Sequence, residues 1–147
     1  MKFYQKLKVL SCAGLLIISQ LGFAQTTKKA VHKSIENRIK EYEKIAKSIW
    51  EWAEVGYQEE KSASLLKTTL AKEGFNIESS VAEIPTAFVA EYGSGKPIIG
   101  VLAEYDALPG ISQAVASKGI RFIDGGSGLA CGHHLFGTAS VSYTHLR

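Results

Sequence analysis

The run of six residues at positions 98–103 constrains the fold of this chain more than any other feature. Its sequence, Ile-Ile-Gly-Val-Leu-Ala, has no polar residue at any position. Successive side chains of a β-strand point to opposite faces, so a strand of this composition is apolar on both faces. Such strands are typical of sheets that are covered on both sides. We therefore predict a strand over residues 98–103 that is buried within a sheet.

Two amphipathic helices are expected before this strand. Apolar residues recur at helical spacing over residues 35–53, after Ser34 as a candidate N-cap, and Gly56 breaks the pattern. A second helix is predicted over residues 59–73, with Gly74 as its natural C-terminal stop. Its apolar face consists of four residues, Leu65, Leu66, Thr69 and Leu70.

Short strands are predicted between the second helix and the apolar run. Alternating apolar residues indicate a strand over residues 75–81, and residues 87–92 indicate another. A tight turn at residues 93–95, Gly-Ser-Gly, then leads into the apolar run. Helices that precede a strand buried on both faces indicate a layered α/β domain.

The first 24 residues form a segment of their own, which we interpret as a secretory signal peptide. Three lysines make a positive start, residues 9–18 are apolar, and small residues precede a cleavage site between Ala24 and Gln25. One alternative is an uncleaved membrane anchor, although the apolar run is shorter than the roughly 20 residues that span a bilayer. Another is a lipid-modified Cys12, which fits poorly because apolar residues continue after it. Residues 25–33, polar and basic, are expected to be a flexible lead-in.

The interpretation as a signal peptide changes the charge balance and the number of cysteines. Three of the 17 basic residues lie in the signal and none of the 14 acidic residues does, so 14 of each remain. This balance gives no indication of binding to nucleic acid or to anionic membranes. Cys131 becomes the single cysteine, so it is a buried inert thiol, an intermolecular cross-link or a thiolate with a chemical role. Export predicts a periplasmic or secreted protein, without stable membrane insertion after cleavage.

Two groups of polar residues follow the apolar run. Residues 104–110, Glu-Tyr-Asp-Ala-Leu-Pro-Gly, come directly after it, at the position where open α/β sheets bind their ligands. Further along, Gly132 separates Cys131 from His133, and a glycine there allows both side chains to approach one cation. Thiolate and imidazole are good ligands for Zn²⁺ and similar ions. Cys131 and His133 are therefore candidate metal ligands.

The acidic residues near the apolar run extend this hypothesis. Asp106 is a candidate supporting acid, because a carboxylate that accepts the second ring proton of a ligating histidine fixes its orientation. Glu104 is either a direct ligand or a charge at the end of the strand. Two other interpretations of Cys131 and His133 stay open: a core cysteine beside a hydrogen-bonded histidine, or a nucleophilic cysteine activated by the histidine. The nucleophile is disfavoured because residues two apart on an extended segment form a chelate more readily than an attacking pair.

The order of these motifs resembles the aminoacylase and carboxypeptidase type of metal-dependent amidohydrolases, a family of metallopeptidases. Within it the chain is most similar to the branch of the aminobenzoyl-glutamate hydrolase B subunit. Six stretches carry the resemblance: residues 52–57 and 59–62 for the opening helices, 84–90 and 92–95 for the first strands, and 104–110 and 130–133 for two early active-site motifs.

The resemblance implies helices that flank a largely parallel central sheet, and hydrolysis of an amide bond next to an amino-acid carboxylate. The implied substrates are N-acyl, aminobenzoyl or aminoacyl amino acids, including dipeptides. Two divalent metal ions, zinc or manganese, would share a bridging water and polarise the amide carbonyl, while a glutamate acts as general base. Cys131 and His133 match the family's Cys-Gly-His ligands, and Asp106 matches the acid that supports the metal site. Glu104 is a further candidate ligand, and a homodimer is expected for the whole protein.

The chain departs from the family pattern in two places. Relatives often have Asp or Asn at the position of His134, so His134 is not assigned as a ligand. Relatives continue as an Ala-rich helix where this chain has residues 141–147, which we interpret as a non-native tail in which His145 has no role.

Family members are also far longer than this chain. Residues 34–140 are therefore expected to be the N-terminal part of a truncated catalytic domain. The catalytic base and the remaining ligands are then expected beyond residue 147, and the chain alone is expected to be inactive. The competing class is an exported, non-catalytic protein that binds a small molecule or peptide on the same fold.

Overall fold

The computed structural model describes residues 28–142, which divide into two units at Arg38. The signal peptide predicted for residues 1–24 lies outside the described residues, as do residues 143–147. In the first unit, residues 28–37 are helical, so residues 28–33 do not form the expected flexible lead-in and Ser34 is not an N-cap. The physical reason is that residues 28–37 contain neither Gly nor Pro, while their lysines and Ala30 favour a helix.

The second unit begins with helix α2 (Ile39–Trp52), which confirms the first predicted helix over most of its length. Its buried face consists of Tyr42, Ile45, Ala46 and Ile49, as their helical spacing predicts. The helix ends before Gly56 is reached, because Ala53 has a left-handed backbone with φ of 44°. The chain therefore turns at an alanine. The left-handed conformation is less favourable in free energy for a residue with a Cβ than for glycine.

Helix α3 (Glu60–Lys72) confirms the second predicted helix and its stop at Gly74. Gly74 has φ of 86°, and its N–H donates to the carbonyl of Ala71. The N–H of Phe75 donates to the carbonyl of Leu70. These two bonds form a Schellman motif, in which a left-handed residue satisfies the last carbonyls of the helix.

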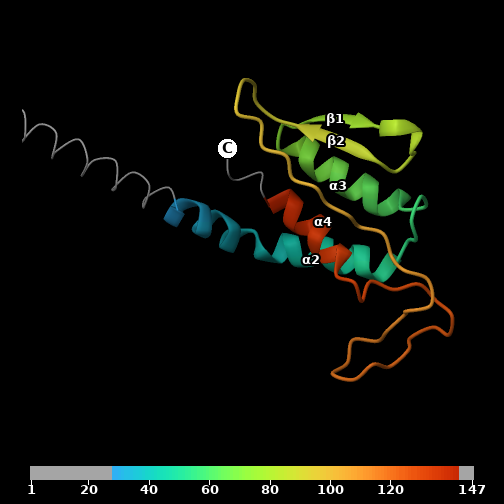
Figure 1. Ribbon diagram of the computed structural model, residues 1–147. Helices are drawn as coiled ribbons and strands as arrows, with labels where there is room; N and C mark the ends of the chain where they lie inside the picture. The colour runs from blue at the N-terminus through green and yellow to red at the C-terminus, as the bar shows by residue number, and fades with distance from the viewer. Residues whose placement is uncertain (1–27, 143–147) are drawn as a thin grey trace, which may run out of the picture. The chain divides into compact units, whose positions relative to one another are not determined.

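Strands β1 (Asn76–Ser79) and β2 (Phe88–Glu91) pair antiparallel, with Asn76 opposite Glu91 and Ser79 opposite Phe88. Both strands lie within predicted segments. A short 3₁₀ turn, η1 (Val81–Glu83), connects them. The hairpin packs on α3, as its place beside that helix in Figure 1 shows.

The buried strand predicted at residues 98–103 is not formed among the described residues. The segment forms no strand, and its apolar side chains are exposed, with Ile98 84% and Leu102 79% accessible. An apolar run becomes a strand only where another backbone supplies its hydrogen-bond partners, and the paired strands among residues 28–142 are β1 and β2 alone. The described fold is therefore a mixture of helices and a small antiparallel sheet. It is compatible with the α/β class, but among the described residues it contains no parallel central sheet.

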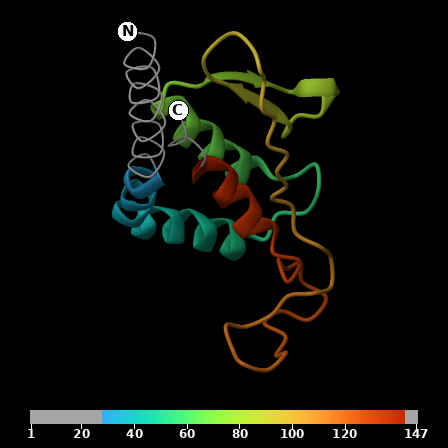
Figure 2. The same cartoon turned by 60° about the vertical axis from the view of Figure 1, so that its left-hand side comes forward.

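Helix α4 (His133–Ser142) completes the second unit and packs against α2 and α3 (Figures 1 and 2). Val141 is fully buried, together with Ile49 of α2, Leu66 of α3 and Leu129. Residues 141 and 142, assigned above to the tail, thus continue α4. None of the helices among residues 28–142 has the length and hydropathy needed to cross a bilayer.

Candidate metal centre

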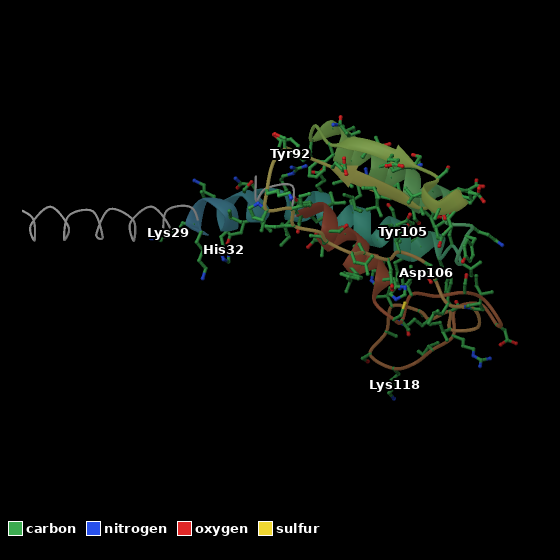
Figure 3. The ribbon with its side chains drawn as sticks, turned by 45° about the horizontal axis from the view of Figure 1, so that its top comes forward. Lys29, His32, Tyr92, Tyr105, Asp106 and Lys118 are labelled. Carbon is green, nitrogen blue, oxygen red and sulfur yellow. The ribbon has the colours of Figure 1, made fainter. Side chains whose placement is uncertain are left out.

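The segment of residues 104–106 passes the beginning of helix α4, and this crossing forms the candidate site. His133 is the first residue of α4, and Gly132 before it has φ of 90°. The N–H groups of Leu135 and Phe136 donate to the carbonyl of Gly132, so the first helical turn fixes His133 in place. Tyr105 and Asp106 lie near this turn in Figure 3.

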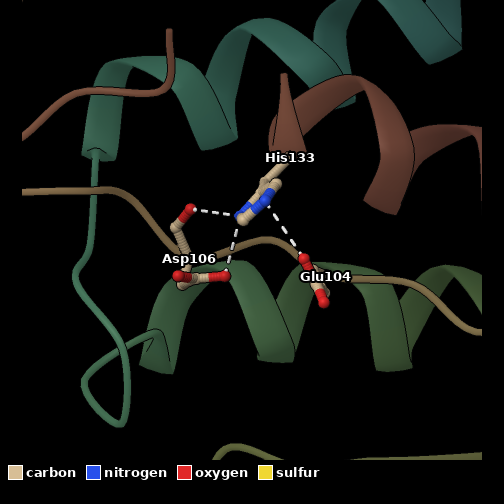
Figure 4. A group of neighbouring side chains, drawn as sticks. All are labelled: Glu104, Asp106 and His133. Carbon is tan, nitrogen blue, oxygen red and sulfur yellow. Dashed lines mark hydrogen bonds and ion pairs between the residues drawn. The ribbon is translucent and has the colours of Figure 1, made fainter. Parts of the chain in front are cut away.

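Both ring nitrogens of His133 face carboxylates. Nδ1 lies 2.9 Å from Oδ1 of Asp106 and 3.1 Å from its backbone carbonyl oxygen. Nε2 lies 3.0 Å from Oε2 of Glu104. Figure 4 shows the two acids on one segment, in contact with different atoms of the imidazole ring. Two carboxylates that converge on one imidazole ring create a place that favours a positively charged group.

Contacts of the neighbouring backbone hold the segment at this position. The N–H of Ala107 donates to the carbonyl of Glu54 at 2.7 Å, and Leu108 exchanges two backbone hydrogen bonds with Gly128. On the α4 side, a Cβ placed on Gly137 would lie 3.2 Å from both the carbonyl oxygen of Glu104 and the Cβ of Tyr105. The absence of a side chain at Gly137 therefore allows the segment to approach the helix closely.

The three side chains fit a divalent cation. One ligand atom each from Glu104, Asp106 and His133 lies within 4.8 Å of the others. Imidazole nitrogen and carboxylate oxygen suit zinc and manganese. The side chains of His133 and Asp106 are mostly shielded from solvent, whereas that of Glu104 is about half exposed, so the group is accessible from one side.

Cys131 does not belong to this group in the structure. It is an exposed free thiol, and among residues 28–142 the gathered ligand groups are Glu104, Asp106 and His133 only. The left-handed backbone of Gly132 thus orients His133 toward the acids without bringing Cys131 with it. The role of Cys131 as a metal ligand stays a prediction. Asp106 contacts Nδ1 of His133, and its role as a supporting acid also stays a prediction.

His134 lies outside the group of Glu104, Asp106 and His133. Burial lowers its pKa, and its buried Nδ1 has no hydrogen-bond partner within the described residues. Desolvation disfavours the charged imidazolium and therefore favours the neutral ring.

The sequence did not reveal a second polar group behind the site. Oγ1 of Thr86 donates to Oε2 of Glu59 at 2.7 Å, and the hydroxyl of Tyr105 donates to the carbonyl of Thr86. Burial, followed by the negative charge of Glu59, raises the pKa of Tyr105 to about 12, so the phenol stays protonated as a donor. Glu59 and Thr86 fall within stretches that resemble family motifs, but no sequence spacing indicated that they meet.

The comparisons with known proteins agree with the resemblance found in the motifs. No family model matches the chain. A curated protein, the B subunit of p-aminobenzoyl-glutamate hydrolase from Escherichia coli (strain K12), is 40% identical over 113 residues, which make up 76% of this chain. The same match covers 24% of that protein, so the chain spans about a quarter of its length. At this identity over most of its length, the chain is a homologue of part of the B subunit of aminobenzoyl-glutamate hydrolase.

Proposed function

We propose that the whole protein containing this chain is a metal-dependent amidohydrolase that cleaves aminobenzoyl-glutamate or a related N-acyl or aminoacyl amino acid. The contact that carries the proposal is the placement of His133 between Glu104 and Asp106, on a chain that is 40% identical to part of a named hydrolase. The family cleaves amide bonds that lie next to an amino-acid carboxylate. The glutamate part of aminobenzoyl-glutamate supplies such a carboxylate.

Each of the three residues has a distinct part in this proposal. His133 offers Nε2 to a cation, and Glu104 lies 3.0 Å from the same nitrogen as a second ligand. Asp106 accepts the proton on Nδ1 at 2.9 Å, which fixes the ring tautomer and makes Nε2 a better electron donor. A divalent cation bound there supplies Lewis acidity toward the amide carbonyl and a nucleophilic water at neutral pH.

We also propose that residues 1–147 alone do not hydrolyse amides. The small number of metal-ligating side chains that lie together supports this part of the proposal. Two zinc or manganese ions would need about twice the ligands that the gathered group offers, together with a general base. Among residues 28–142, one group of three side chains can hold an ion. Cys131 is proposed to join it when the rest of the protein is present, since the match covers only about a quarter of the relative.

We also propose that residues 98–103 form an inner strand of a largely parallel sheet in the whole protein. The supporting observation is their exposure here, because a run of exposed Ile, Val and Leu side chains is unusual for a surface segment. Hydrogen exchange of the whole protein checks this: backbone amides of residues 98–103 should exchange as slowly as those of α3. Exchange as fast as in an exposed loop would contradict the inner strand.

Export and assembly complete the proposal. The Lys-rich start and apolar run of residues 1–24 support export to the periplasm or beyond. The relative's name calls it a subunit, which supports assembly with other chains, and a homodimer is the expected form. The substrate is a small molecule, and the charge balance gives no reason to expect nucleic acid.

A pair of histidine variants in the whole protein tests the activity. His133→Asn should lose bound metal and lower aminobenzoyl-glutamate hydrolysis by more than the roughly 10–100-fold expected from loss of a supporting residue. His134→Asn, the matched control, should keep its metal content and most of its rate. Metal content is measured by elemental analysis and hydrolysis with added zinc or manganese. Equal rates and metal contents for the two variants would contradict the proposed centre, and metal binding without hydrolysis of any acyl amino acid would favour the non-catalytic binder.

A further inference from the structure

The polar group behind the candidate site is connected to it through a single residue. Tyr105 stands between the two acids in the sequence, and its hydroxyl reaches the backbone carbonyl of Thr86. Its ring also lies near that of Phe88, with centroids 6.1 Å apart. Because Tyr105 is bonded in the chain to both Glu104 and Asp106, the anchoring of its side chain restricts where these two acids can lie.

Thr86 and Glu59 are buried deeply enough to act as a fixed support. Glu59 is 8% and Thr86 is 6% exposed, and they are joined by a 2.7 Å hydrogen bond. Glu59 directly precedes α3, where the free N–H groups of a helix favour a negative charge. A buried carboxylate that lost its hydrogen bond would be destabilised, so the contact with Thr86 is strongly favoured.

We propose that Glu59, Thr86 and Tyr105, here named the polar network, are positioning residues for the metal centre. Glu59 fixes Thr86, the carbonyl of Thr86 fixes the hydroxyl of Tyr105, and Tyr105 holds residues 104–106 so that the two acids reach opposite nitrogens of His133. None of the three is among the residues proposed to bind the cation. This inference rests on the proposed metal centre and adds the residues that hold its ligands in place.

The polar network is expected to affect the geometry of the metal ligands in addition to the stability of the fold. Tyr105 is flanked directly by Glu104 and Asp106, so a small rotation of the segment moves both carboxylates together. Ligand sets tolerate displacements of only about half an ångström before their affinity falls. The loss of one anchoring hydroxyl should therefore change the geometry around the cation as well as the stability of the fold.

The test uses metal binding by the whole protein, with Zn²⁺ and Co²⁺ as the probes. Tyr105→Phe should bind Zn²⁺ about 10-fold more weakly, the lower end of the range for supporting partners. It should also change the visible absorption of bound Co²⁺, which reports coordination geometry. Tyr92→Phe is the matched control, because it also removes one phenolic hydroxyl and keeps the ring beside Phe75. The control should bind Zn²⁺ and absorb like the unchanged protein.

A second pair of variants separates positioning from stability. Thr86→Val removes the hydroxyl that donates to Glu59 at nearly constant volume, and should weaken Zn²⁺ binding as Tyr105→Phe does. Thr86→Ser keeps the donor and should restore affinity and the Co²⁺ spectrum. Thermal unfolding without metal gives the folded fraction, so all affinities are compared for folded protein.

The outcomes distinguish this inference from the proposed function. If His133→Asn loses metal while Tyr105→Phe and Thr86→Val bind with unchanged affinity and spectrum, the positioning role is wrong and the metal centre stands. If His133→Asn binds metal normally, the proposed centre itself is wrong. If Thr86→Ser fails to restore what Thr86→Val loses, the hydroxyl is not the anchor and the network is overturned.

Discussion

The carboxylate of Asp106 lies 2.9 Å from Nδ1 of His133, although 27 positions separate the two residues in the chain. The contact joins the segment after the exposed apolar run to the first turn of α4. It gives the histidine a defined orientation with Nε2 directed toward Glu104. Such a carboxylate beside a histidine is the arrangement that prepares an imidazole for a cation.

Asp106→Asn should weaken Zn²⁺ binding by the whole protein by roughly 10–100-fold, because a neutral amide oxygen accepts the Nδ1 proton less strongly than a carboxylate. Isothermal titration calorimetry with Zn²⁺ measures the change. Asp124→Asn is the control, since the side chain of Asp124 is 91% exposed and pairs with Arg121 on a surface loop. A loss of affinity of the same size in both variants would show that general charge, not the contact with His133, causes it.

Glu54→Ala should destabilise the fold by about 1 kcal/mol, as the loss of a helix cap does. The carboxylate accepts hydrogen bonds from the N–H groups of Lys61 and Ser62, at 3.0 and 2.9 Å, in the first turn of α3. Glu51→Ala is the control, because its surface pair with Lys47 at 3.8 Å is worth about 0.5 kcal/mol or less. Urea unfolding measures both free energies, and equal losses would contradict a capping role for Glu54.

Gly128→Ala should destabilise the protein and displace the site segment. A Cβ at this position would lie 2.4 Å from the backbone carbonyl oxygen of Ile111, so the backbone must move. The hydrogen bonds between Gly128 and Leu108, two residues after Asp106, would then be strained. Gly119→Ala meets no atom within 4 Å and is expected to be neutral or slightly stabilising. A thermal midpoint for Gly128→Ala equal to that of Gly119→Ala would refute the clash.

The stability of the metal-free protein should fall at alkaline pH because of Tyr105. Its pKa of about 12 in the folded state lies above the ordinary value of 10.0, so the unfolded chain releases this proton first. The contribution of Tyr105 is therefore complete below pH 10 and is lost as the pH rises from 10 toward 12. The difference in unfolding free energy between the unchanged protein and Tyr105→Phe should shrink over this window. A difference that stays constant from about pH 9 to about pH 12 would show that the phenol is not held protonated.

The exported protein should begin at Gln25, within one or two residues. This follows from the positive start, the short apolar run and the small residues before Ala24. Mass spectrometry of the N-terminal peptide from a periplasmic extract measures the new terminus. Recovery of an intact Met1 from that extract would contradict cleavage.

The local elements could be predicted from the sequence because each depends on neighbouring residues. Buried positions repeat every three to four residues in α2, and Gly74 is the residue that a Schellman motif needs. Glu104, Asp106 and His133 could be predicted as candidate site residues, because the sequence gives the chemical type of each side chain. The end of α2 at Trp52 lies one residue from the last apolar position of the predicted pattern, but no local rule selects an alanine for the φ of 44° at Ala53.

Only the tertiary structure decided which of these residues meet. The apolar run at residues 98–103 has the composition of a buried strand, but pairing needs a second backbone, and the described residues supply none. Cys131 and His133 are two positions apart, yet the turn at Gly132 leaves the thiol exposed and directs the imidazole toward the acids. The contacts of Tyr105 with Thr86, and of Thr86 with Glu59, join three separate segments. The sequence by itself thus determined α2, α3, the two short strands and the chemical types at the site. Contacts between distant segments decided the geometry, because such contacts depend on packing that no local pattern contains.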